Sequence, residues 1–125
     1  LFIRGMCVLR PGVPGVSETI RVRSIVGRFL EHSRIVAFEN GGDREIFVGS
    51  ADWMGRSLDR RVETMVPVLD PLLAETIYGQ IVAIIAADNV KARELQQDGT
   101  YKRLRSDGKM PVNAQQVFLT QAQAL

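Results

Sequence analysis

The sequence predicts a single α/β domain, in which the strands of a mixed β-sheet are packed with helices. Short runs rich in Val, Ile and Phe alternate with turns rich in Gly, Pro and Asn, as expected for strands. One longer apolar stretch, residues 72–87, instead repeats its large side chains at helical spacing. The length of 125 residues, with 46% hydrophobic and 24% charged residues, is typical of one globular domain.

The first half of the chain is expected to consist mainly of strands. Residues 1–9 are an apolar run closed by a loop with two prolines and two glycines, which predicts a strand and then a rigid loop. Residues 20–26 predict either a strand or a strand that continues into a helical turn at Phe29 and Leu30. Residues 33–39 and 45–49 flank a glycine-rich turn and predict a β-hairpin.

The second half adds the helices. After a strand expected over residues 61–69, Asp70 and Pro71 supply an N-cap and a first-turn proline for a helix over residues 72–87. Because this helix is apolar on most sides, we expect it to be buried against a sheet. A short edge strand over residues 99–104 and a glutamine-rich helix over residues 112–125 complete the expected fold.

Charge is distributed unevenly along the chain. The net charge of +2 is too small for a dedicated nucleic-acid binder. Residues 1–61 nevertheless contain ten arginines and no lysine against seven acids, whereas the remaining residues contain six bases and seven acids. The guanidinium fork matches phosphate oxygens, so this composition favours a phosphate ligand. Solvated arginines, or arginines paired with acids, explain it equally well.

Two further features bear on the location of the protein. The single cysteine, Cys7, has no partner for a disulfide, which favours a reducing cytoplasm. No apolar run reaches the roughly 18 residues needed to cross a bilayer. The chain begins within an apolar run at Leu1, and we expect it to be an N-terminally truncated fragment of a larger protein.

His32 is the first candidate functional residue, because it is the only histidine of the chain. In an extended segment, His32 and Arg34 would lie on the same face. An imidazole beside a guanidinium suits phosphoryl chemistry, since the imidazole can act as nucleophile, acid or base while the guanidinium holds phosphate oxygens. A packed histidine without a chemical role is the alternative.

Other polar residues have two possible explanations each. Arg4 lies within an apolar run and requires either an internal carboxylate or an anionic ligand. The turn over residues 49–52 could hold an anion or position a histidine, or could simply end a strand with Trp53 in the core. Arg61 could form an ion pair, the more conservative interpretation, or belong to a phosphate clamp. The sequence has no Walker loop and no metal-ligand cluster, so Mg²⁺ would be bound through substrate phosphates.

Six segments carry a resemblance to a known family. In order, they are Ile3-Arg4-Gly5, Leu9-Arg10-Pro11-Gly12-Val13-Pro14-Gly15, Ile25-Val26-Gly27-Arg28-Phe29-Leu30-Glu31-His32-Ser33-Arg34, Phe38-Glu39-Asn40-Gly41, Ser50-Ala51-Asp52-Trp53-Met54 and Leu58-Asp59-Arg60-Arg61-Val62-Glu63. Together they resemble the last domain of the polyphosphate kinases. The resemblance covers most of the chain and implies a phospholipase D-like fold, of which such an enzyme carries two related copies, this domain being the second.

The resemblance also implies roles for individual residues. Arg4 and His32 would contact the triphosphate of ATP, with His32 as the catalytic residue, and Arg10 and Arg61 would be further phosphate contacts. The histidine that becomes phosphorylated would lie in the preceding domain. Phospholipase D-like domains show His-x-Lys and Gly-Ser-x-Asn, but this chain has Arg34 in place of the lysine and Asp52 in place of the asparagine. This departure argues against hydrolysis through His32.

The implied activity is reversible transfer of the terminal phosphate of ATP to polyphosphate, with Mg²⁺ ligands outside this chain. The expected partners are ATP or ADP, polyphosphate, the preceding domains and further copies of the intact enzyme, but no specific nucleic acid. The expected location is the cytoplasm, including the periphery of the inner membrane. Two alternatives remain: a phospholipase D-like phosphodiesterase with His32 as nucleophile, and a non-catalytic module that binds phosphoanions. The isolated chain is expected to be inactive.

Overall fold

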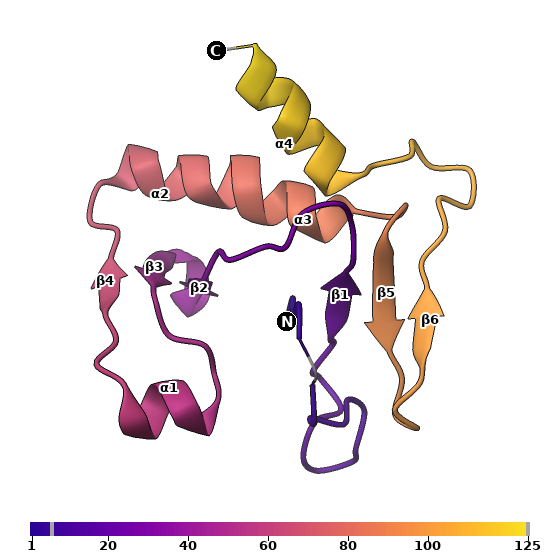
Figure 1. The fold of residues 1–125 in the computed structure, drawn as a ribbon, viewed down its shortest axis with the longest axis horizontal. Helices are drawn as coiled ribbons and strands as arrows, with labels where there is room; N and C mark the ends of the chain where they lie inside the picture. Colours follow the sequence, from indigo (N-terminus) through magenta and orange to yellow (C-terminus); the bar gives the residue numbers. More distant parts are fainter. Residues whose placement is uncertain (6, 125) are drawn as a thin grey trace. The chain divides into compact units, whose positions relative to one another are not determined.

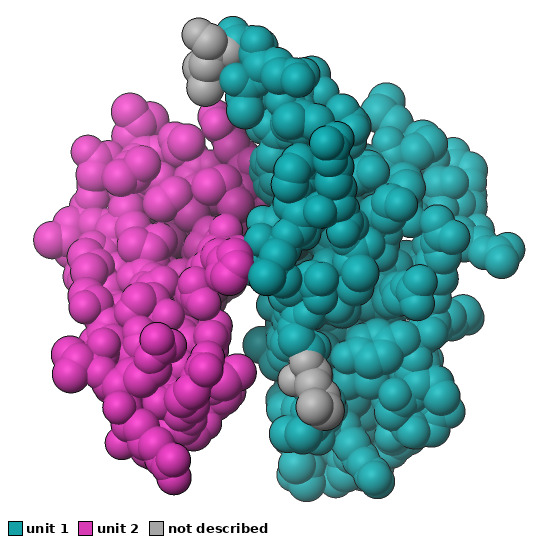
Figure 2. Space-filling model, in the orientation of Figure 1, with its two compact units in different colours: residues 1–31, 84–125 teal, residues 32–83 magenta. Residues whose placement is uncertain are grey.

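The structure, a computed structural model, describes residues 1–5 and 7–124. Met6 and Leu125, which belong to an expected strand and an expected helix, lie outside the described residues. The chain divides into two compact units (Figure 2). Unit 1 comprises Leu1–Glu31 and Ile84–Leu125, and unit 2 comprises His32–Ala83. Unit 2 is thus inserted into the sequence of unit 1.

Unit 1 is built on a three-stranded antiparallel sheet in the order β1-β5-β6 (Figure 1). Its strands are β1 (Arg23–Ile25), β5 (Ala92–Leu95) and β6 (Tyr101–Arg103). The helix α4 (Ala114–Gln123) begins at Asn113, whose side chain accepts a hydrogen bond from the backbone N–H of Gln116. The core joins β1, β5 and α4, and it consists of buried Ile25, Ala92 and Ala114 with Ile84, Ile85, Leu104 and Phe118 packed against them.

Unit 2 contains a second antiparallel sheet, in the order β2-β3-β4. The strands are β2 (Ile35–Phe38), β3 (Glu45–Gly49) and β4 (Met65–Pro67). A 3₁₀ turn, η1 (Asn40–Gly42), joins β2 to β3, and the short helix α1 (Gly55–Arg60) lies between β3 and β4. The hairpin predicted from the glycine-rich turn is therefore confirmed, with Ile46 of β3 almost completely buried.

A continuous helical segment follows β4. It comprises α2 (Pro71–Ile77), the π-helical η2 (Tyr78–Val82) and α3 (Ala83–Ala87). The predicted cap is present, because the Asp70 side chain accepts a hydrogen bond from the N–H of Leu73. The expected burial is wrong: none of these helical residues is buried, and the side chain of Leu72 is 78% exposed.

Several other expectations are corrected by the structure. The described part of residues 1–9 forms no strand and pairs only through a parallel bridge between Phe2 and Arg23. No helical turn forms at Phe29 and Leu30. Trp53, one alternative for a core residue, is 79% exposed. Within the described part of the chain, no helix is long and apolar enough to cross a membrane.

Candidate functional site

The four predicted site residues fall into the two units. Arg4 and Arg10 lie in unit 1, and His32 and Arg61 lie in unit 2.

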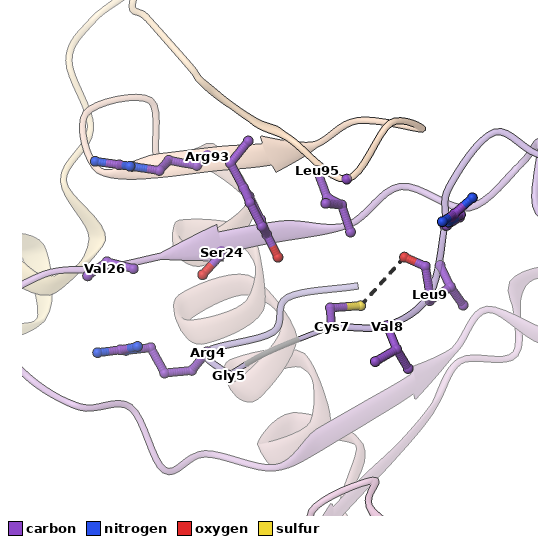
Figure 3. Close-up of a pocket in the computed structure, with 12 residues that line it drawn as sticks. Arg4, Gly5, Cys7, Val8, Leu9, Ser24, Val26, Arg93 and Leu95 are labelled. Atoms are coloured by element: carbon purple, nitrogen blue, oxygen red, sulfur yellow. Dashed lines mark hydrogen bonds between the residues drawn. The ribbon is translucent and has the colours of Figure 1, made fainter.

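In unit 1, Arg4 and Arg10 line one cavity of about 640 Å³ (Figure 3). A third arginine, Arg93 of β5, lines the same cavity. In the view of Figure 3, the side chains of Arg4 and Arg93 extend in the same direction, on either side of Val26. The lining also includes Ser24 and Tyr101 and, among residues 1–5 and 7–124, no acidic residue. This concentration of guanidinium groups without a carboxylate suits an anion.

The loop after the first apolar run fixes the backbone near Arg10. The Ser17 hydroxyl donates to the Arg10 carbonyl and accepts from the N–H of Val13, and the N–H of Gly12 donates to the Ser17 carbonyl at 2.8 Å. Gly12 has φ of +75°, a conformation that favours glycine. The predicted rigid loop is confirmed, and it holds the backbone at Arg10 in place while the side chain stays exposed.

Arg4 is distinguished, within the described part of the chain, by a buried guanidinium N–H that has no acceptor. Its Nε is buried and makes no hydrogen bond, and within residues 1–5 and 7–124 no carboxylate forms an ion pair with it. A buried guanidinium N–H without an acceptor is costly, so an anionic ligand is the physically preferred partner. The alternative of an internal carboxylate finds no support among the described residues.

In unit 2, His32 is exposed and precedes the start of β2. Arg34, which follows it, forms an ion pair with Asp52 at 2.9 Å and donates a second hydrogen bond to the backbone carbonyl of His32 at 2.7 Å. Because β2, β3 and β4 are antiparallel, the start of β2, the end of β3 and the start of β4 lie at the same end of the sheet. His32, Asp52 and Arg61 therefore all flank this end.

Arg61 belongs to a second set of contacts at this end of the sheet. Its guanidinium lies 3.8 Å from the Glu63 carboxylate, so the ion-pair interpretation is supported for Arg61. Glu63 also accepts a hydrogen bond from the Ser50 hydroxyl, which in turn accepts from the N–H of Thr64. The Arg61 side chain remains 55% exposed, and a ligand can still reach its guanidinium.

Arg93 is the site residue that sequence reasoning missed. Its strand, β5, was not predicted, because the run is short and contains charged residues at its centre. Pairing with β1 places Arg93 opposite Ser24, which brings it to the cavity. The arginine-rich composition concerned residues 1–61, so it gave no indication that Arg93 would line the same cavity.

The described residues offer no protein metal site. No group of three or more His, Cys, Asp and Glu residues in residues 1–5 and 7–124 could hold a metal ion. The carboxylates of Asp52 and Glu63, which flank the same end of the sheet as His32, are engaged with Arg34 and with Ser50. These residues do not fit a Mg²⁺ site.

Comparisons with known proteins agree with the resemblance of the ordered motifs. Residues 1–115 match the family model "Polyphosphate kinase C-terminal domain 2". The chain is 53% identical over 123 residues to a polyphosphate kinase of Synechocystis sp., covering 98% of this chain and 17% of that protein. It is 59% identical over 103 residues to that of Thermosynechococcus vestitus, covering 82% and 14%. The chain thus spans less than a fifth of the length of these relatives.

A solved structure extends the likeness to three dimensions. The crystal structure of polyphosphate kinase from Porphyromonas gingivalis matches with a TM-score of 0.87 and 40% sequence identity, over 96% of this chain and 18% of that one. The predicted fold class, an α/β domain of the phospholipase D type, is thereby confirmed, but the strands form two antiparallel sheets and not the one mixed sheet that was expected. From the family match, the relatives and the shared fold, the chain belongs to the polyphosphate kinase C-terminal domain family.

Proposed function

We propose that this chain is the part of a longer polyphosphate kinase that holds the phosphates of ATP during their reversible transfer to polyphosphate. The observation that carries the proposal is the cavity of unit 1, whose lining includes Arg4, Arg10 and Arg93 and, among the described residues, no carboxylate. Arginine binds phosphate oxygens with two N–H groups at once. In phosphoryl transfer the protein mainly positions the reacting groups and stabilises the charge on the phosphate oxygens, and arginine side chains can do both.

The proposed division of labour follows from the family resemblance together with the residues that the chain contains. A histidine of a preceding domain attacks the γ-phosphorus, the bond to the β-phosphate oxygen breaks, and ADP leaves. The phosphohistidine then passes its phosphoryl group to the terminal oxygen of polyphosphate. Arg4 holds oxygens of the triphosphate, while exposed His32 donates a hydrogen bond or exchanges a proton at the transferring phosphate. Mg²⁺ bound to the nucleotide would supply further charge neutralisation.

The phosphodiesterase alternative is weakened by the environment of His32. A phosphodiesterase of the phospholipase D type would use the basic residue two positions after the histidine to hold its substrate. Here that residue, Arg34, is hydrogen-bonded to Asp52 and to the His32 carbonyl. Its guanidinium is therefore already engaged within the protein.

Calorimetric titration of ATP into the complete enzyme tests the role of Arg4. We expect Arg4→Ala to weaken ATP binding about ten- to a hundredfold, because a charge-assisted contact contributes roughly 1.5–3 kcal/mol. Arg4→Lys should recover part of the affinity, since lysine keeps the charge but loses the fork. Arg105→Ala is the control, because exposed Arg105 lies outside the cavity lining. A large loss of stability with unchanged ATP affinity would refute the phosphate role.

A further inference from the structure

The side chain of Arg34 joins two segments of unit 2, the one that carries His32 and the turn after β3 that carries Asp52. Its Nε and Nη2 lie 3.0 and 2.9 Å from Oδ1 of Asp52, and its Nη1 donates to the carbonyl oxygen of His32 at 2.7 Å. One planar group thereby connects the turn after β3 to the backbone of the histidine. The guanidinium can donate to the Asp52 carboxylate and to the His32 carbonyl at once, because its N–H groups point in fixed directions.

The position of Asp52 is itself fixed by the end of the sheet. The N–H of Gly49 donates to the Arg34 carbonyl, and a Cβ on Gly49 would lie 2.8 Å from the Thr64 carbonyl oxygen, so the backbones approach closely there. The next residue, Ser50, is bonded through both its N–H and its hydroxyl to the segment that leads into β4. The turn that carries Asp52 therefore starts from a well-anchored point.

The ion pair is too exposed to be mainly a stabilising contact. The side chains of Arg34 and Asp52 are 31% and 36% exposed, and exposed ion pairs contribute little to stability. Its more important consequence is geometric, because it restricts the backbone of the segment that carries His32. The two positions are also those at which the sequence departs from the phospholipase D pattern, so the two departures form one complementary pair.

We propose that Arg34 and Asp52 are positioning residues for His32. The Asp52 carboxylate orients the Arg34 guanidinium, and Arg34 holds the His32 carbonyl so that the imidazole meets the transferring phosphate in a fixed orientation. This inference rests on the proposed function of His32. Misplacing a catalytic group by about 1 Å can cost roughly a hundredfold in rate, so the loss of this restraint should be visible in turnover.

A double-mutant cycle in the complete polyphosphate kinase tests the proposal. Turnover and the KM for ATP are measured for His32→Ala, Asp52→Asn and the double variant. We expect Asp52→Asn to lower kcat about ten- to a hundredfold, with the KM for ATP changed less than about twofold. In the His32→Ala background, Asp52→Asn should lower kcat no further, because the residue through which it acts is gone.

A matched control comes from unit 1, where Arg23 makes the same kind of contacts. Arg23 lies 2.9 Å from Glu94, with side chains 27% and 29% exposed, and it donates to the backbone carbonyl of Ala86. Glu94→Gln removes a similar ion pair that involves neither Arg34 nor Asp52, and it should leave kcat unchanged. Asp52→Glu keeps the charge but lengthens the side chain by a methylene group, which displaces the carboxylate from Arg34. It should therefore lower kcat while the melting temperature is retained.

The outcomes separate this inference from the proposed function. If His32→Ala lowers kcat but the effect of Asp52→Asn is absent, or simply adds to it, Arg34 and Asp52 do not act through His32 and the positioning role is refuted. If His32→Ala leaves kcat unchanged, the proposed role of His32 fails, and the positioning inference fails with it. A fall in melting temperature for Asp52→Asn and Asp52→Glu, with full activity per folded molecule, would show a purely structural pair.

Discussion

The individual arginines of this chain serve two different purposes. Four of them lie 2.9 to 3.8 Å from a carboxylate, namely Arg23, Arg34, Arg44 and Arg61. Arg4, Arg10 and Arg93 have no such partner within residues 1–5 and 7–124, and they line one cavity. Pairing with acids therefore accounts for four arginines, and a phosphate ligand remains our proposal for the arginines of the cavity.

A single carboxylate, that of Asp88, organises the junction of three elements in unit 1. The side chain is only 1% exposed. Its Oδ1 accepts hydrogen bonds from the backbone N–H groups of Val90, Lys91 and Ala92, at 2.7 to 3.1 Å, and its Oδ2 accepts from Ala114 at 2.8 Å. The end of α3, the start of β5 and the start of α4 are thereby tied to one residue.

Replacement of Asp88 should be among the most destabilising changes in unit 1. Asp88→Ala leaves four N–H groups without their acceptor, two of them buried, so we expect a loss of at least about 3 kcal/mol in the free energy of unfolding. Asp88→Asn keeps one oxygen and should cost about 1 to 3 kcal/mol. Urea unfolding measures both. Asp98→Ala is the control, because Asp98 caps an exposed turn, and equal losses at the two positions would contradict the argument.

At the scale of elements, Arg44 connects the β2–β3 hairpin of unit 2 to the helical segment. Its guanidinium makes two hydrogen bonds to Glu39 and one to Glu75 of α2 at 2.9 Å. Its Cζ lies 3.5 Å from the ring centroid of Tyr78 in η2. The hydrogen bond from Arg44 is the main cause that lowers the pKa of Glu39 below its usual value of 4.5.

The lowered pKa of Glu39 predicts how this connection responds to acid. Because the folded-state pKa lies below the unfolded one, ionised Glu39 stabilises the fold above about pH 4.5, and this contribution is lost as the pH falls through the lower folded value. The effect should be small, since the pair is exposed. We expect Glu39→Gln to reduce the acid-side loss of stability in urea unfolding between pH 7 and pH 3. An unchanged pH dependence would refute the contribution of Glu39.

Elements with strong local signals could be predicted, and those that depend on distant pairing could not. The hairpin has a glycine-rich turn between two apolar runs, and the helix has its cap at Asp70, so both are specified by adjacent residues. The strand expected over residues 1–9 is absent from the described residues because pairing with β1 is limited to the bridge at Arg23, which is too short to form a ladder. Conversely, β5 forms because β1 and β6 pair with it, although its own residues include charges.

The residues of the candidate site likewise divide into those that the sequence could indicate and those that depend on distant strand pairing. Arg4 could be proposed because it stands out within an apolar run, Arg10 could be proposed from the resemblance of the ordered motifs, and both line the cavity. Arg93 could not, since only the pairing of β5 with β1 brings it there. The Arg34 contacts likewise depend on the close approach of β3 and β4 at Gly49, which no local pattern reveals.

At the scale of the whole molecule, much apolar surface is uncovered in each unit. The buried hydrophobic side chains of the described residues are few, and unit 2 exposes large ones such as Leu69 at 85% and Leu72 at 78%. Surfaces of this kind usually mark contacts with other proteins or domains. They support the proposal that the chain works together with the preceding domains of a longer enzyme.

This division of labour predicts the behaviour of the chain alone. His32 is its only imidazole, and we place the phosphorylated histidine in a preceding domain, so the purified chain should form no polyphosphate from ATP and Mg²⁺. With ATP radiolabelled in its γ-phosphate, the complete enzyme should retain acid-labile label, as expected for phosphohistidine, whereas the 125-residue chain should retain none. The complete enzyme with His32→Ala should still become labelled, although more slowly, because His32 assists the transfer without accepting the phosphate. Acid-labile label on the isolated chain would instead make His32 the nucleophile, and it would move the covalent step into this domain.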